Sequence, residues 1–338
     1  MTGVRPGLRV ALVGGAGFIG HHLALKLREM GAEPHVLDSL QVNNLGAFAK
    51  PSDDGRNLRY VKFIHERLDL LRAQGVPLHI VDARDYSALT RSLEDIAPDV
   101  VVHLAAVAHA NRSNKDPFST FDHSARTLEN ALDSARNLAA QFVYFSSSMV
   151  YGDFGVSEVD EGHPCEPIGI YGALKYGGEK LVIAYQQVFD LPFTIVRPSA
   201  LYGERCVSRR VGQAFIENAL AGLPLVVNGD GTDALDFTYI QDLVDGVICC
   251  IGNERAYNEI FNLTFGEARS LREMIEILKE QIPDVEVEYQ ARDSLMPERG
   301  TLSGAKAKEF IGYKPSWPLE IGLVHYLDWY REHLSVNG

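Results

Sequence analysis

The sequence predicts an α/β fold in which a doubly wound parallel sheet is joined to a smaller C-terminal α/β lobe. Through the first two thirds of the chain, short β-branched runs alternate with longer helical stretches. Such alternation is typical of a parallel sheet with helices on both faces. After Val196 the alternation breaks down, and prolines and glycine turns become frequent. At 338 residues, the chain is long enough for one large domain and a smaller lobe.

Each predicted strand is a short apolar run, as expected for strands that are buried on both faces of a sheet. The predicted strands are Arg9–Val13, His35–Leu37, His79–Val81, Val100–Leu104, Phe142–Phe145 and Phe193–Val196. The stretches between them predict helices at Ile19–Met30, Tyr86–Ile96, Ser124–Ala139 and Tyr171–Phe189. The polar segment 41–58 is predicted to be an irregular loop.

The last third of the chain is predicted to be mixed in structure. A strand-like run at Asp236–Ile240 leads into a helix that starts near Asp242. Amphipathic helices are predicted at Ser270–Gln281 and Leu319–Leu334. The cleft between the sheet and this part of the chain is the natural place for a ligand. The predicted domain boundaries are 1–196 for the first domain, to which 236–262 returns, and 197–235 with 263–338 for the lobe.

Composition and charge narrow the class of protein. The formal net charge of −13 disfavours nucleic acid or an anionic membrane as the main partner, although a small anionic ligand stays possible. No apolar run reaches the length of about 18 residues that a transmembrane helix needs, and residues 1–8 lead directly into a strand without a signal peptide. Cys165, Cys206, Cys249 and Cys250 lack metal-type spacing. The sequence therefore predicts a cytoplasmic protein with reduced thiols.

A glycine-rich turn follows the first strand directly and opens the first helix. Its glycines are Gly14, Gly17 and Gly20. Because they lack Cβ atoms, they let the chain turn tightly and let the backbone approach a pyrophosphate at a helix N-terminus. Asp38, at the end of the second strand, can accept both ribose hydroxyls of adenosine and would repel a 2′-phosphate. Together these features predict a Rossmann-type domain that binds NAD rather than NADP.

The ends of neighbouring strands extend this predicted cofactor site. Asp82 ends the third strand, where it either accepts from the adenine amino group or caps the following helix. Small residues at 104–106 let a cofactor lie close to the sheet edge. The residues predicted to bind NAD are Gly14, Gly17, Phe18, Ile19, Gly20, Asp38, Ser39, Leu40, Asp82, Ala83, Leu104, Ala105, Ala106, Ser146, Tyr171, Lys175 and Pro198.

Tyr171 and Lys175 lie four residues apart on one predicted helix and therefore on the same face. A free tyrosine has a pKa of about 10, so a tyrosine base needs its phenolate stabilised by about 4 kcal/mol to act near neutral pH. The ammonium of Lys175 and a positive nicotinamide ring both act in that direction. Lys175 can also hold the nicotinamide ribose. The pair predicts that Tyr171 is a general base.

A serine-rich strand end, 145–152, lies upstream of this pair. A hydroxyl there can share a substrate oxygen with the Tyr171 phenolate and pass the proton along. Serines at a strand terminus also serve simply as turn formers, so both interpretations stay open.

On these motifs the chain resembles the extended short-chain dehydrogenase/reductase family, in the branch that contains the nucleotide-sugar epimerases (UDP-glucose 4-epimerase among them), dehydratases and decarboxylases. The resemblance covers nearly the whole chain. Besides the glycine turn, Asp38 and the Tyr171/Lys175 pair, it rests on His103–Ala106, Arg197-Pro198, Tyr202-Gly203, Gly229–Gly231, Asp236–Ile240 and Gly312–Pro315. It implies that Ser147, four residues before Tyr151, is the catalytic hydroxyl beside Tyr171 and Lys175.

The resemblance also separates reaction types. Dehydratases of this family carry Asp-Glu after the catalytic hydroxyl, and decarboxylases typically keep a glutamate at the second of these places. Here those places hold Ser148 and Met149. The resemblance thus implies an NAD-dependent epimerase of a nucleotide-diphosphate sugar, acting at C4 through a transient keto sugar. The alternatives are a nucleotide-sugar dehydrogenase, reductase or 4,6-dehydratase, and more remotely a non-catalytic NAD-sensing protein.

The substrate contacts depart from the family pattern at three places. The asparagine expected to contact the substrate diphosphate is Ala200, and the arginine expected before Asp236 is Leu235. The usual asparagine in the helix after Pro117 is not clearly present, and Asp122, His123 and Ser124 lie near its place. Arg209, Arg210 or Arg299 could replace the missing groups, and Phe215 either contacts a base or belongs to the core. The residues predicted to bind substrate are Ser147, Ser148, Met149, Arg210, Phe215 and Arg299.

No metal site is predicted, because the histidines lack ligand spacing. His21, His22 and His103 are interpreted as structural, whereas His109 and His123 could approach the cleft. The resemblance further implies a homodimer that packs through the helices near 124–139 and 171–189.

Overall fold

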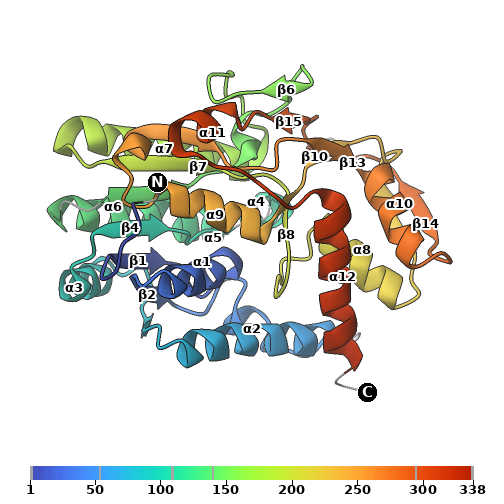
Figure 1. Cartoon of the computed structure of the whole chain (residues 1–338), viewed down its shortest axis with the longest axis horizontal. Coiled ribbons are helices and arrows are strands. Elements are labelled where there is room, and N and C mark those ends of the chain that lie inside the picture. The colour runs from blue at the N-terminus through green and yellow to red at the C-terminus, as the bar shows by residue number, and fades with distance from the viewer. Residues whose placement is uncertain (1–2, 53–54, 108–109, 139–140, 294, 336–338) are drawn as a thin grey trace.

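The computed structural model describes residues 3–52, 55–107, 110–138, 141–293 and 295–335. Its centre is a seven-stranded sheet in the order β12-β7-β5-β4-β1-β2-β3 (Figure 1), and every neighbouring pair is parallel. The predicted doubly wound sheet is therefore confirmed. Its strands are β1 (Arg9–Val13), β2 (Glu33–Asp38), β3 (Leu78–Ile80), β4 (Val100–His103), β5 (Gln141–Phe145), β7 (Phe193–Arg197) and β12 (Glu259–Asn262).

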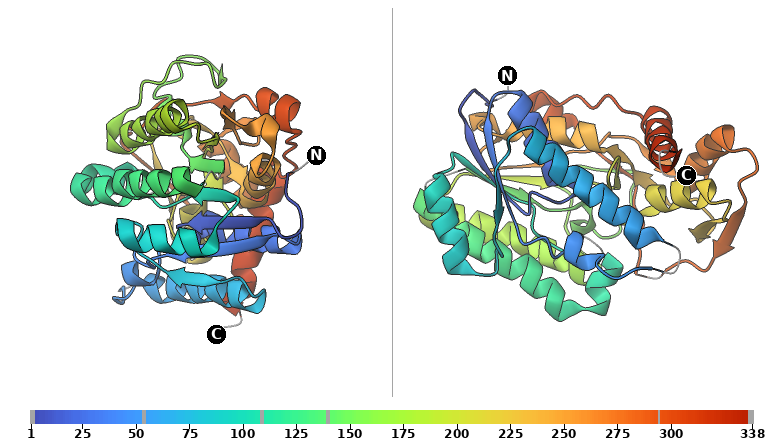
Figure 2. Two further views of the ribbon diagram at one scale, coloured as in Figure 1. Left: turned by 90° about the vertical axis from the view of Figure 1, so that its left-hand side faces the viewer. Right: turned by 90° about the horizontal axis from the view of Figure 1, so that it is seen from below.

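Helices cover both faces of the sheet because alternate residues of each strand point into two separate cores. In β1, Val10 and Leu12 belong to one core, whereas Ala11 and Val13 belong to the other. Figure 2 (left) shows α3, α6 and α7 stacked on one side of the sheet, with α9 and α11 on the opposite side. The first core is shared with α1 (Phe18–Glu29), α2 (Arg56–Ala73) and α9 (Ile240–Cys250), and the second with α3 (Tyr86–Ile96), α6 (Thr127–Leu138) and α7 (Gly169–Phe189).

The strand order reverses between β1 and β4. From β1 the chain builds outward to β2 and β3, and it then returns to add β4, β5, β7 and β12 on the other side. Val13 and His103 are partners at the carboxyl ends of β1 and β4. In open α/β sheets the crevice at such a reversal is where ligands bind. The glycine turn after β1 therefore lies at the place that the topology favours for a cofactor.

A smaller group of elements lies at one end of the sheet. Figure 1 shows α8, α10 and β14 clustered there, with α12 running down beside them. The elements of this part are β8 (Leu201–Tyr202), α8 (Val211–Leu220), β9 (Leu225–Asn228), β10 (Ala234–Asp236), β11 (Thr238–Tyr239), β13 (Ala268–Ser270), α10 (Leu271–Gln281), β14 (Val287–Gln290), β15 (Thr301–Leu302) and α12 (Leu319–Ser335). In contrast, α11 (Ala305–Ile311) packs against β12 and α9 of the sheet.

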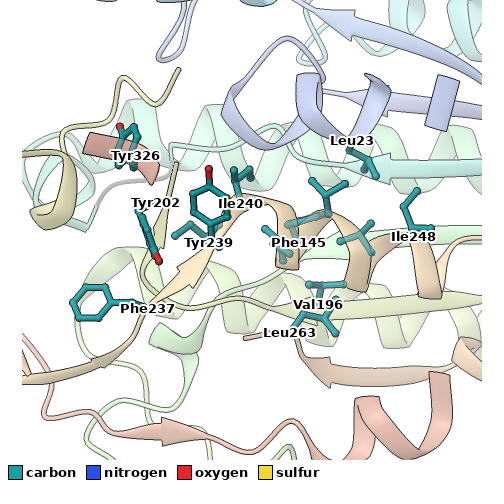
Figure 3. Packing of buried hydrophobic residues seen from close by; sticks show 14 of the residues in the cluster. Leu23, Phe145, Val196, Tyr202, Phe237, Tyr239, Ile240, Ile248, Leu263 and Tyr326 are labelled. Carbon is teal, nitrogen blue, oxygen red and sulfur yellow. The ribbon is translucent and has the colours of Figure 1, made fainter. Parts of the chain in front are cut away.

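The junction between this group and the sheet is apolar and continuous. Figure 3 shows Tyr202, Tyr239 and Tyr326 in the same buried cluster as Phe145 and Val196 of the sheet strands. On α12, Trp329 packs its ring 4.7 Å from that of Phe63 on α2. One hydrophobic core therefore joins the two parts, and burial of this kind is what stabilises such a contact.

The short elements complete the chain. They are η1 (Leu45–Ala47), α4 (Ala110–Lys115), α5 (Pro117–Phe121), η2 (Asp122–Arg126), η3 (Ser148–Val150), β6 (Glu158–Val159) and η4 (Glu254–Ala256). Among the residues described, no helix combines the length and apolar character needed to cross a membrane.

Most predicted elements agree with the structure, but three differ. The segment 41–58 is not wholly irregular, since it contains η1 and α2 begins at Arg56. The strand predicted at 236–240 is two short strands, β10 and β11, interrupted at Phe237, and α9 begins at Ile240 rather than near Asp242. The helix predicted at 124–139 starts as the π-turn η2 before α6, and Ala139 lies outside the described residues.

Candidate active site

The glycine turn takes its shape from close contact with the end of β4. Gly14 has φ +83°, and a Cβ atom there would lie 2.6 Å from the backbone nitrogen of Ala105. At Gly17 a Cβ atom would lie 3.3 Å from the Gly14 oxygen, which is a tight contact but a milder one than at Gly14, and Gly17 lines the cavity beside this turn. Gly17 is the N-cap of α1, and no side chain caps it. The first backbone N–H groups of α1 are therefore available to bind an anion.

Asp38 is held rigidly beside this turn. One carboxylate oxygen accepts from the backbone nitrogen of Ala16 at 3.0 Å, and the other accepts from that of Leu40 at 2.8 Å. Burial raises the pKa of Asp38, although both of these hydrogen bonds oppose the shift. Each oxygen keeps a further lone pair, so the carboxylate can still accept from a pair of ribose hydroxyls.

One cavity brings most of the predicted cofactor residues together. Of the predicted set, it is lined by Gly14, Gly17, Phe18, Ile19, Gly20, Asp38, Ser39, Asp82, Ala83, Leu104, Ala105 and Ala106. Leu40 is not in the lining and acts through its amide on Asp38. Arg67, His123 and Thr127 also line this cavity, and sequence reasoning did not assign them to the cofactor site. A glycine cradle with a buried carboxylate beside it fits an adenine dinucleotide.

Asp82 lies in the cofactor cavity and does not cap α3, whose N-cap is Asp85. The guanidinium of Arg84 donates to both carboxylate oxygens of Asp82, and to Asp122 at 2.9 Å. This pairing lowers the pKa of Asp82. Of the two interpretations of Asp82, the structure therefore excludes the helix cap.

A second cavity contains the predicted catalytic residues. It is lined by Ser146, Ser147, Ser148, Met149, Tyr171, Lys175, Pro198, Arg210, Phe215 and Arg299, which include every predicted substrate residue. Ile19, Leu104 and Arg210 line both cavities, so the two adjoin along a shared wall. A sugar in the second cavity would therefore lie next to the end of a dinucleotide in the first.

Lys175 is fixed below this cavity by its own hydrogen bond. Its Nζ donates to the carbonyl of Phe145 at 2.6 Å and lies 5.2 Å from the centre of the Tyr144 ring. Burial lowers the pKa of Lys175 to about 8, and the negative charge of Glu179 opposes this shift. Tyr171 is one helical turn earlier and half-buried. The helix therefore presents a phenol and an ammonium to one cavity wall, as the spacing predicted.

The serine strand end is packed tightly against α7. A Cβ atom on Gly172 would lie 2.7 Å from the Met149 carbonyl oxygen, so only glycine permits this approach. The hydroxyl of Ser147 accepts from the backbone nitrogen of Met149 at 3.2 Å. Ser148 and Met149 are both buried. Neither side chain carries an acid, so this wall contributes no acid–base group beyond the phenol, the ammonium and the hydroxyls.

A buried polar network behind this wall was missed by sequence reasoning. Glu179, two turns after Tyr171 on α7, accepts from the Ser146 hydroxyl at 2.5 Å and pairs with Arg197 at 2.6 Å. Arg197 also donates to the hydroxyl of Tyr151, which donates to Asn262 on β12. Spacing alone could have placed Glu179 on the face of Lys175, but its partner comes from β7 and is remote in sequence.

The charged residues that line the second cavity, besides Lys175, are Arg209, Arg210, Arg292 and Arg299, together with Asp233 and Asp293. The Nε atom of Arg299 is buried and has no partner among the residues described. Burial, followed by the charge of Arg210, lowers the pKa of Arg299 to about 10, so its guanidinium stays charged at neutral pH. Ala200 and Leu235, two of the departures from the family pattern, line the same cavity. Phe215 belongs to the core, being 2% exposed, while also forming part of the wall.

The histidines divide as expected between structure and cleft. His21, His22 and His103 are buried, and burial lowers the pKa of His22 and of His103 to about 3. His123 lines the cofactor cavity, whereas His109 lies outside the described residues. Within the part of the chain that the structure describes, no group of three or more His, Cys, Asp or Glu residues could hold a metal ion.

The fold and the paired cavities are those of a dinucleotide-binding enzyme. The model of the NAD dependent epimerase/dehydratase family matches residues 10–264, so the chain belongs to this NAD-dependent family. It is 28% identical to the "Putative UDP-glucose 4-epimerase" of Methanocaldococcus jannaschii, over 96% of this chain and 99% of that protein. It is also 28% identical to a dTDP-glucose 4,6-dehydratase of Actinoplanes sp., over 97% and 99% of the two chains.

Solved structures agree with this assignment. The UDP-glucose 4-epimerase of Thermotoga maritima, solved with UDP-glucose, superposes with a TM-score of 0.85 at 25% identity, covering 97% of this chain and 100% of that one. The expected fold class and the NAD cofactor are thereby confirmed.

Proposed function

We propose that this protein epimerises a nucleotide-diphosphate sugar at C4, with Tyr171 as the base. The observation that carries this proposal is the wall of the second cavity. That wall combines Tyr171, Lys175 and Ser147 and adjoins the cofactor cavity, but it has no carboxylic acid at 148 or 149. Epimerisation through a keto sugar needs a base and a cofactor, whereas elimination of water needs further acids.

The residues of the first cavity suit NAD. The N–H groups at the start of α1 would bind its diphosphate, the Asp38 carboxylate would accept from the adenosine ribose, and Lys175 would hold the nicotinamide ribose. When bound, NAD supplies a reversible hydride acceptor next to the second cavity. These assignments rest on the lining of the cavity and on the hydrogen bonds of Asp38 and Lys175.

The protein's own residues handle the proton. Tyr171 removes the proton from the sugar hydroxyl as the carbon is oxidised, and the Ser147 hydroxyl shares the same oxygen. Lys175 stabilises the phenolate through its positive charge, which lies on the same helix face one turn away. When the keto sugar turns over in the cavity, Tyr171 returns the proton, and reduction from the opposite face completes the inversion.

The relatives include both epimerases and 4,6-dehydratases, so the choice between these two reactions depends on the residues of the site. A 4,6-dehydratase must protonate a leaving hydroxyl and remove a proton from C5. Ser148 and Met149, buried against α7, are poor acids for either step. The site residues therefore favour epimerisation.

The test is incubation of the NAD-loaded protein with UDP-, dTDP-, GDP- and CDP-sugars, followed by chromatography with mass detection. A product of unchanged mass but altered retention is expected. Loss of water, of carbon dioxide or of two hydrogens would contradict the proposal and indicate a dehydratase, decarboxylase or dehydrogenase. Unchanged sugar with all four nucleotides would support the non-catalytic alternative.

Isotopes sharpen this test. With a substrate deuterated at C4, the epimerised product is expected to keep the deuterium, because the same hydride leaves and returns. In D2O an unlabelled substrate is expected to gain no carbon-bound deuterium, whereas a dehydratase would introduce it at C5. Tyr171→Phe is the matched control, since it keeps the cavity but removes the base.

We further propose that the protein is a cytoplasmic homodimer that packs through α6 and α7. The four cysteines are free thiols, which suits a reducing compartment. Phe118 and Phe121 on α5, with Val188 and Phe189 at the end of α7, are exposed apolar side chains near this face. Light scattering of the purified protein is expected to give twice the 37.3 kDa chain mass, and a monomer at micromolar concentration would contradict the proposal.

The domain boundaries stay a proposal as well. The pairing of β12 with β7 supports the return of 236–262 to the sheet domain.

A further inference from the structure

Arg67 is a buried arginine on α2 whose hydrogen bonding is incomplete. Its side chain is 0% exposed. The Nε atom donates to the backbone carbonyl of Arg205 at 3.0 Å, and Nη2 donates to the same oxygen. The Nη1 atom is buried and has no partner among the residues described. A buried guanidinium nitrogen without an acceptor is costly, so its presence requires a reason.

Among the residues that the structure describes, no carboxylate is hydrogen-bonded to Arg67. Asp38 is close enough to stabilise that charge, but both of its oxygens accept from the backbone amides of Ala16 and Leu40. The neighbouring Arg205 adds a second positive charge and pairs with Glu66 at 3.1 Å. Burial, partly offset by nearby groups, lowers the pKa of Arg67 to about 10, so the guanidinium is still protonated at neutral pH. A buried cation of this kind suits an anionic ligand.

The position of Arg67 indicates which anion. It is one of the residues that line the cofactor cavity, as are Gly17 and Phe18 at the start of α1, and its charge acts on His21 in the first turns of that helix. That helix start is already suited to a phosphate through its N–H groups. Arg67 comes from a different helix, so it would approach the same anion from another side.

We propose that Arg67 is a phosphate ligand of the cofactor and that Nη1 donates to its diphosphate. The other two donors of Arg67, Nε and Nη2, bind the carbonyl of Arg205. These bonds fix the guanidinium before the cofactor binds, so less side-chain entropy is lost on binding. The inference rests on the NAD site of the proposed function. It is tested by nucleotide binding without any sugar, so it can fail while epimerisation stands, and the reverse also holds.

The experiment is calorimetric titration of nucleotide-free protein, as wild type and as Arg67→Met, with NAD, ADP-ribose, NADP and adenosine. Because the variant loses a charge-assisted hydrogen bond to phosphate, NAD and ADP-ribose should each bind to it about 10- to 100-fold more weakly than to the wild type. Adenosine, which lacks phosphate, should bind equally to both proteins. Methionine has a similar length and removes a buried charge, so the variant is expected to fold.

The control variant is Arg72→Met on the same helix, where the arginine is exposed and pairs with Asp69. It should bind every nucleotide as the wild type does. Wild-type affinity of Arg67→Met for NAD and ADP-ribose would overturn the proposal. An equal loss for adenosine, or a loss confined to NADP, would overturn it too, since these outcomes indicate a damaged cavity or a 2′-phosphate contact.

A second variant keeps the proposal testable if Arg67→Met does not fold. Arg67→Lys keeps the charge, but its single ammonium cannot replace all three donor positions of the guanidinium. A smaller loss with the same pattern is expected, affecting NAD and ADP-ribose but not adenosine. Wild-type affinity for ADP-ribose in this folded variant would contradict the role of Nη1.

Discussion

Tyr171, Lys175 and Glu179 follow one another at intervals of four on α7, and each has a different task. Tyr171 reaches the cavity, Lys175 is buried below it, and Glu179 lies deeper still in an ion pair with Arg197. Solvent exposure along this helix face therefore decreases from the half-buried phenol of Tyr171 to the buried carboxylate of Glu179. Chemistry at the top of the face depends on charges that the lower residues hold in place.

Tyr171→Phe is the most direct test at the scale of one residue. Loss of the phenol removes the only predicted base, so turnover should fall by about 10²- to 10⁴-fold. Affinity for NAD should change little, because the glycine turn and Asp38 are untouched. Steady-state kinetics together with NAD titration checks both expectations. Near-normal turnover would remove Tyr171 from the mechanism.

Lys175 sets an expected pH limit. Because burial lowers its pKa to about 8, the ammonium is charged below that pH and neutral above it. Once neutral it no longer stabilises the Tyr171 phenolate, so kcat/KM should decline above about pH 8 with a single ionisation. The measurement is kcat/KM across a pH series in a buffer of constant ionic strength. A flat profile through this region would argue against the charge of Lys175 as the support for the base.

At the scale of elements, the glycine turn shows how two glycines one helical turn apart serve different needs. Gly14 needs both its positive φ and its missing Cβ, since the turn touches the end of β4. Gly17 has an ordinary φ of −72° and lines the cofactor cavity, and a Cβ atom there would lie 3.3 Å from the Gly14 oxygen. The fold thus requires glycine more strictly at Gly14, whereas at Gly17 the space left for a ligand is the main constraint.

Gly17→Ala and Gly14→Ala should therefore fail in different ways. Gly17→Ala is expected to lose less stability than Gly14→Ala, while NAD binds at least about tenfold more weakly, because a methyl group enters the cradle. Gly14→Ala should lose roughly 1–3 kcal/mol of stability from backbone strain alone, and more from the contact with Ala105. Thermal unfolding and NAD titration of both variants separate the two effects. Equal stability of the two variants would contradict this division.

At the scale of the whole molecule, the ion pair between Glu179 and Arg197 connects the active-site helix to the sheet. Through Tyr151 and Asn262 the network continues to β12, which pairs with β7 although it lies more than 60 residues later in the sequence. Helix, strand end and returning strand are therefore tied by one set of buried hydrogen bonds. Such a network stabilises only while every member keeps its partner.

Glu179→Ala should destabilise the fold strongly, by about 3–5 kcal/mol, because it leaves Arg197 buried and unpaired. Asp328→Ala, which breaks an exposed pair with Arg331 on α12, should cost less than about 1 kcal/mol. Chemical denaturation of both variants provides the comparison. If the two losses were similar, the buried network would not be what ties α7 to the sheet.

Local patterns in the sequence were sufficient for the sheet and for many of the residues that line the two cavities. Continuous apolar runs identified six of the seven sheet strands, because strands buried on both faces have no polar alternation. The expectation of burial was wrong for β3, an edge strand on which Leu78 and Ile80 are exposed. The glycine spacing and the Tyr171/Lys175 spacing are properties of one turn and one helix, and both cavities contain them. Spacings of this kind can be recognised in the sequence without knowledge of the tertiary fold.

Contacts between distant segments were decided only by the tertiary structure. β12 is a short strand whose partner, β7, lies more than 60 residues earlier. The helix α2 was not predicted, because its buried face includes the charged Arg67. Arg67, Glu179 and Arg197 each derive their importance from a partner on another element. Burial and pairing of charge arise when the chain closes on itself, so residue spacing along the sequence carries little trace of them.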